Sequence, residues 1–166
     1  MGMTGYLLRL TPLELDEYKK DSSLLEKRMI NYYAPENDDS NFVRLDRAWH
    51  GILFLLTGQS FENYTHPLAK IFFSGQLVDE NQNLGYGPAH YLTSDQVTEL
   101  NIEIAKISTD ELKHRYDINK MTEMEIYPVA WEDEGMGDYL AYHFGIVRQV
   151  FSEAAKNNEA IISIVA

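Results

Sequence analysis

Asp46 and His50 are the residues whose types and spacing best fit acid–base chemistry in this sequence. They stand four residues apart in a stretch whose apolar spacing predicts a helix over residues 42–57, which would place both on one helix face. A carboxylate in that position can orient the imidazole and raise its basicity. The structural alternative is a polar stripe beside Trp49 that only ties the helix to a neighbouring loop.

A second candidate segment, residues 85–93, holds two glycines, two tyrosines and one histidine ahead of a predicted helix. Glycines permit close approach of the backbone to a ligand, and a helix N-terminus favours an anion. The alternative is a tight loop that enters a buried strand. We expect both segments and residues 125–127 to converge on one cleft, with His50 within hydrogen-bond reach of a carboxylate. The candidate pocket residues are Asp46, Trp49, His50, Tyr86, His90, Tyr91, Glu125 and Tyr127.

Metal and cofactor motifs are missing from the sequence. It has no cysteine, and no two of its five histidines lie three or four residues apart. The glycines near residue 85 lack the third glycine of a dinucleotide-binding loop, and no Gly-Lys-Ser/Thr phosphate loop is present. The sequence therefore predicts no metal site and no cofactor.

The elements that would position these residues form a predicted single domain over residues 1–166. Apolar strands are expected near each end, at residues 4–10 and 159–165, and a helix of about twenty residues at 138–157. Capping boxes at Thr11–Glu14 and Thr93–Gln96 predict two helix starts. Either end strand alone would leave an unpaired edge, so both are expected in one sheet. The prediction is a helix-rich α+β fold with a small mixed or antiparallel sheet.

Charge is strongly negative, with 14 basic and 26 acidic residues and a formal net charge of −12. Twelve acids and four bases fall within residues 95–138. A charge of this sign repels phosphate backbones and anionic lipid, so neither nucleic acid nor membrane is an expected partner. The acidic stretch is either a solvated helical face or a docking surface for a basic protein. The first residues do not fit a secretion signal, and we expect a cytoplasmic location.

Several segments resemble the YfbM-like family, small bacterial proteins of unknown function. The signature is Asp46-Arg47-Ala48-Trp49-His50-Gly51-Ile52, continued by Phe54-Leu55-Leu56-Thr57-Gly58. Further matching segments are Met1-Gly2-Met3, Gly5-Tyr6, Pro67-Leu68, Gly85-Tyr86-Gly87-Pro88-Ala89, Tyr91-Leu92-Thr93, Met124-Glu125-Ile126-Tyr127-Pro128 and the apolar C-terminal strand. The resemblance implies a single α+β domain in the bacterial cytoplasm and brings no activity with it.

Two functions fit these residues. The first is a non-enzymatic acidic binding domain, including an immunity protein that neutralises a basic toxin. The second is an enzyme-like domain that binds a small molecule or nucleotide at Asp46, His50 and residues 85–93. One version of the second is an ADP-ribosyltransferase-like fold, in which Arg9, residues 91–94 and Glu123-Met124-Glu125 would mimic the three motifs of that fold.

Overall fold

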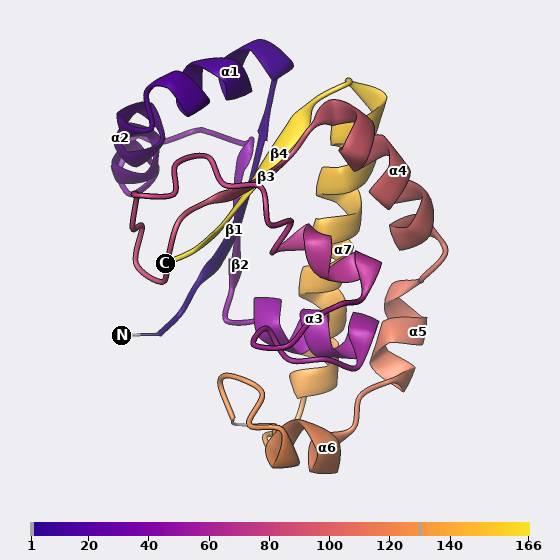
Figure 1. Ribbon diagram of the computed structural model, residues 1–166. Helices are drawn as coiled ribbons and strands as arrows, with labels where there is room; N and C mark the ends of the chain where they lie inside the picture. Colours follow the sequence, from indigo (N-terminus) through magenta and orange to yellow (C-terminus); the bar gives the residue numbers. More distant parts are fainter. Residues whose placement is uncertain (1, 130) are drawn as a thin grey trace.

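The computed structural model describes residues 2–129 and 131–166 and shows one antiparallel sheet with helices on both faces (Figure 1). The strands are β1 (Gly5–Leu10), β2 (Phe42–Asp46), β3 (His90–Leu92) and β4 (Ala160–Val165), in the order β2-β1-β4-β3. Gly5 pairs with Val165 and Leu10 with Ala160, so the first and last strands are neighbours at the centre of the sheet. The predicted α+β class and the shared sheet are confirmed.

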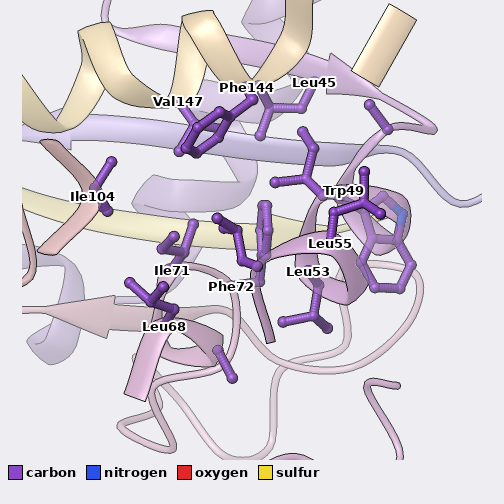
Figure 2. Close-up of a cluster of buried hydrophobic side chains, with 14 of the residues drawn as sticks. Leu45, Trp49, Leu53, Leu55, Leu68, Ile71, Phe72, Ile104, Phe144 and Val147 are labelled. Carbon is purple, nitrogen blue, oxygen red and sulfur yellow. The ribbon is translucent and has the colours of Figure 1, made fainter. Parts of the chain in front are cut away.

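Helices cover the sheet because its strands alternate apolar side chains between two cores. Leu8 of β1 packs with α1 (Pro12–Lys20) and α2 (Ser23–Tyr32), whereas Leu7 faces the opposite core. That second core is built by the helices named here: α3 (Trp49–Thr57), the 3-10 helix η1 (Pro67–Ile71), α4 (Ser94–Ala105), α5 (Thr109–His114), α6 (Ile118–Glu123) and α7 (Met136–Lys156). Figure 2 shows side chains from α3, η1, α4 and α7 meeting in it.

The predicted capping boxes are confirmed at both helix starts. Thr11 accepts a hydrogen bond from the backbone of Glu14, and Thr93 accepts one from Gln96. In turn, the side chains of Glu14 and Gln96 accept hydrogen bonds from the backbone N–H groups of Thr11 and Thr93. These bonds satisfy donors that the helix leaves unpaired. These local signals fix where α1 and α4 begin.

The predicted helix over residues 42–57 is wrong over residues 42–48. Phe42–Asp46 is strand β2, and the helix α3 begins only at Trp49. Phe42 and Leu45 point into the two cores, so their spacing also fits a strand. The antiparallel pairing of β2 with β1 decides between helix and strand, because it gives hydrogen-bond partners to the backbone N–H and C=O groups along the outer edge of β1. Asp46 then turns the chain at a φ of 51°.

Candidate functional site

His50 lies inside the second core, on the first turn of α3. Its side chain is buried, with 2% of the residue exposed. The ring nitrogen Nδ1 accepts a hydrogen bond from the backbone N–H of Tyr127 at 2.9 Å, and Nε2 lies 3.1 Å from Oγ of Ser60. Burial lowers the pKa of His50 to about 4. The imidazole is therefore neutral near pH 7.

These two contacts determine which nitrogen of His50 carries the proton. The backbone N–H of Tyr127 can only donate, so Nδ1 is the acceptor and is unprotonated. In a neutral ring the proton is then on Nε2, which donates to the hydroxyl of Ser60. A general base for Ser60 would need a lone pair on Nε2, which this tautomer lacks. The role of His50 is consequently structural: its two hydrogen bonds connect α3 to residue 60 and to residue 127.

Asp46 does not share a helix face with His50, which corrects the sequence-based expectation. It ends β2, where an aspartate tolerates the left-handed backbone better than most residues do. Its carboxylate accepts hydrogen bonds from Arg44 at 3.0 Å and from the hydroxyl of Tyr139 at 3.2 Å. Burial and this carboxylate raise the pKa of Tyr139 to about 12, so the phenol stays protonated. The partners of Asp46 thus come from β2 and α7.

Trp49 and Tyr127 do lie beside His50, as predicted. The indole of Trp49 stacks with the imidazole at 5.0 Å between ring centres and with the Tyr127 ring at 6.4 Å. The indole N–H donates to the carbonyl of Met3 at 3.2 Å, which ties the stack to the first residues of the chain. Because Trp49 and His50 are buried, this group forms part of the core instead of an open cleft.

Phe73 connects residues 85–93 to this group. The ring of Phe73 contacts Trp49 at 5.9 Å and His90 at 5.5 Å. Nδ1 of His90 accepts a hydrogen bond from the backbone of Gly75.

Two tyrosines of the same segment lie elsewhere. Tyr86 is exposed on a loop beside the end of β4. Its backbone N–H donates a hydrogen bond to the carbonyl of Val165. Tyr91 packs on the α1–α2 side, with the ammonium of Lys19 4.8 Å from its ring centre. Glu125 is likewise exposed. Among the described residues, the expected cleft lined by Tyr86, His90 or Tyr127 is not formed around His50, because the imidazole is buried.

The ADP-ribosyltransferase-like arrangement is also not formed. Arg9 is held by Glu159 at 2.9 Å and by Glu153, so its guanidinium is already paired. Thr93 caps α4, and Glu123 ends the helix α6 instead of lying on a strand. Figure 1 places α6 at the end of the molecule away from the turn between α7 and β4.

For the acidic stretch of residues 95–138, the structure shows which charged side chains are paired and which are exposed. All four of its bases are paired with acids from the same stretch: Lys106 with Glu103, Lys113 with Asp138, Arg115 with Glu111, and Lys120 with Asp117. Eight acids are exposed and have no ion-pair partner among the described residues: Asp95, Glu99, Asp110, Glu123, Glu125, Glu132, Asp133 and Glu134. The four basic residues thus neutralise only part of the negative charge, and most of it stays on the surface without a positive partner.

Five of these eight acids gather at α6 and the loop that follows it, at the lower end of Figure 1. Three apolar side chains, those of Ile118, Met124 and Val129, are exposed among them. An open hollow there has both Glu123 and Glu132 in its lining. We call this surface the acidic end; it consists of Ile118, Glu123, Met124, Glu125, Val129, Glu132, Asp133 and Glu134.

Buried groups hold the backbone of the acidic end in an unusual conformation. Glu125 and Val129 have φ values of 50° and 64°, and a positive φ is rare for a β-branched residue. The indole of Trp131 donates to the carbonyl of Ile126 at 2.6 Å, and both side chains are completely buried. His50 fixes the next residue, Tyr127, by the bond described above. His50, which was predicted as a pocket residue, and the core residues Ile126 and Trp131 therefore position the acidic surface.

Sequence reasoning recognised the acidic stretch but missed which part of it forms a surface. No clear signal was present in the sequence, because residues 118, 124 and 129 stand among other apolar residues, such as Met121, Ile126 and Trp131, and only the structure separates the exposed ones from the buried ones. The structure shows no group of three or more potential ligands that could hold a metal within residues 2–129 and 131–166. Among the helices described, none combines the length and apolarity needed to cross a membrane.

Comparison with known proteins identifies the family. A family model described as a domain of unknown function, DUF1877, matches residues 1–164. The chain belongs to the DUF1877 family. Among curated proteins, none matches the sequence.

A solved structure shares this fold. It is the crystal structure of a protein of unknown function, YfbM from Escherichia coli. The alignment covers 98% of this chain and 99% of the YfbM chain, with a TM-score of 0.72 and 16% sequence identity. The resemblance to the YfbM-like family is thus confirmed. At this identity, the likeness shows a shared fold and carries no activity.

Proposed function

We propose that this member of the DUF1877 family is a non-enzymatic interaction domain of the bacterial cytoplasm, and that its acidic end binds a basic protein. The observation that carries the proposal is the combination at one end of the molecule. On α6 and the loop after it, five exposed carboxylates that have no ion-pair partner among the described residues lie together with three exposed apolar side chains. Exposed apolar side chains next to charged ones are a combination found in protein interfaces.

The two kinds of side chain have different roles in this proposal. The carboxylates attract a basic partner over distances of about 8–10 Å at moderate salt and accelerate its association. Ile118, Met124 and Val129 lose apolar surface to the partner, which supplies affinity. The positive φ values of Glu125 and Val129 support the same location, because unfavourable backbone conformations gather at binding sites.

An immunity protein that neutralises a basic toxin is the more specific version of this function. Its support is the same surface, together with the net charge of −12 on a chain of 166 residues. Charge complementarity gives such pairs fast association, which a protein that must intercept a toxin requires. In this version the basic partner uses its positively charged face for its own activity, and the acidic end covers that face.

Site-specific photo-crosslinking in the host bacterium tests the proposal. A photoreactive residue replaces Val129 in the acidic end, and a matched protein carries it at Leu13, an exposed apolar position on α1. The expected result is a crosslink from position 129 to one protein with a basic isoelectric point, and none to that protein from position 13. Purified samples of the two proteins should then bind each other. Equal crosslinking from both positions, or an acidic partner, would contradict the proposal.

A further inference from the structure

A cavity of about 400 Å³ lies between η1 and α4, away from the acidic end. Its size is at the lower end of the range for ligand pockets, which suits a small metabolite. Its lining includes three apolar residues: Leu92 at the end of β3, Leu100 of α4 and Pro67 of η1. The stem of a small aliphatic molecule can pack there.

Charges of opposite sign face this cavity from different elements. Lys70 of η1 lines it, and so do Glu99 and Glu103 of α4. Within the described residues, no ion pair joins Lys70 to either glutamate. Glu103 pairs with Lys106 at 2.8 Å, and Glu99 has no basic partner in that part of the chain. The cavity therefore separates a cation from a carboxylate that do not neutralise each other directly.

A rigid pair of amides completes the lining. Gln76 donates to Gln96 at 2.6 Å and accepts from it at 3.2 Å, and it also donates to the carbonyl of Tyr91 at 3.0 Å. The carbonyl of the Gln96 amide also accepts from the backbone of Thr93, in the capping box of α4. These bonds use both N–H groups of the Gln76 side chain and leave one N–H of Gln96 free. The free donor is held in place, which lowers the entropic cost of using it in binding.

We propose that this cavity binds a small zwitterion, whose carboxylate pairs with Lys70 and whose ammonium pairs with Glu99 and Glu103. The aliphatic part of the ligand would lie on Leu92 and Leu100. One molecule that carries both charges satisfies Lys70 and Glu99 together, whereas an anion alone leaves Glu99, and a cation alone leaves Lys70, without a partner among the described residues. Hydrogen bonds between ionised groups are stronger than those between neutral groups, so loss of either charge is expected to weaken binding about tenfold or more.

Four probes of matched size test the inference by titration, followed by NMR of the 15N-labelled protein. Two of them, 6-aminohexanoate and L-norleucine, are isomeric zwitterions that differ in the spacing of their charges. The other two, hexanoate and hexylamine, each keep one charge of 6-aminohexanoate. We expect at least one zwitterion to shift the amide resonances of Gln96 and Glu99, and both single-charge probes to bind about tenfold more weakly. No shift with either zwitterion, or equal binding of hexylamine, would overturn the inference.

Two substitutions and one control separate this site from general charge effects. Lys70→Met and Glu99→Gln alter exposed side chains that line the cavity, and each should weaken the zwitterion about tenfold. Glu123→Gln removes one charge at the acidic end and should leave zwitterion binding unchanged. Equal loss in all three variants would show a nonspecific effect and would overturn the site. Because this test involves no protein partner, its failure leaves the proposed interaction function intact.

Discussion

The burial of His50 predicts a specific loss of stability at mildly acidic pH. Its pKa is about 4 in the folded protein, against 6.5 for a free imidazole. Between these values the unfolded chain binds a proton that the folded protein does not, so the free energy of unfolding falls as the pH falls. The contribution is complete above pH 6.5 and is lost progressively as the pH falls towards 4.

The size of this loss follows from the two pKa values. Linkage gives a contribution of about 2 kcal/mol lost between about pH 8 and about pH 5, and about 3 kcal/mol once the pH is below 4. His90 and His143 are also partly buried, and burial lowers the pKa of each, so they add to the loss with the same sign. The prediction for His50 alone therefore needs a variant that leaves the other two in place.

His50→Asn is the matched variant, because its amide oxygen lies close to the position of Nδ1 and can accept from Tyr127. Urea unfolding of both proteins at several pH values gives the required free energies. Any loss of packing in the variant shifts its stability equally at each pH. We expect the wild-type protein to lose about 2 kcal/mol more than the variant between about pH 8 and about pH 5. Parallel curves for the two proteins would refute the account of His50 as a buried neutral tie.

Three further substitutions test the packing and the backbone, all by urea unfolding. Gly51→Ala should destabilise by about 1–3 kcal/mol, because its Cβ would lie 2.7 Å from the Trp131 ring. Gly145→Ala on α7 is the control, since its Cβ would meet nothing closer than 3.6 Å, and it should stabilise by about 0.5–1 kcal/mol. Val129→Gly should stabilise by about 1 kcal/mol, because glycine tolerates the φ of 64°. A loss in the control, or a loss at position 129, would contradict these expectations.

Local signals in the sequence predicted much of the fold. The capping residues Thr11 and Thr93 placed two helix starts, and the apolar ends of the chain indicated that β1 and β4 share a sheet. The failure at residues 42–46 has a physical cause. Apolar spacing there fits both a helix and a strand, and pairing with β1, more than thirty residues earlier in the chain, decides between them.

The candidate site was predicted less well than the fold, because the role of a polar residue depends on distant partners. His50 stands 77 residues from Tyr127, whose backbone N–H occupies its lone pair. The spacing of Asp46 and His50 could not show this contact. The acidic end was visible as a run of charge, but its shape depends on Trp131 and Ile126 becoming buried beneath it. Such long-range packing leaves no local pattern in the sequence.

The association rate of the crosslinked partner tests the central claim most directly. A triple variant, Glu123→Gln/Glu125→Gln/Glu132→Gln, removes three charges from the acidic end. Its control, Glu17→Gln/Glu36→Gln/Glu80→Gln, removes three exposed charges from the α1–α2 side and from the loop after residue 78. We expect the first variant to slow association about tenfold or more at low salt and the control to change it by about twofold or less. Equal rates for the two variants would contradict the acidic end as the binding surface.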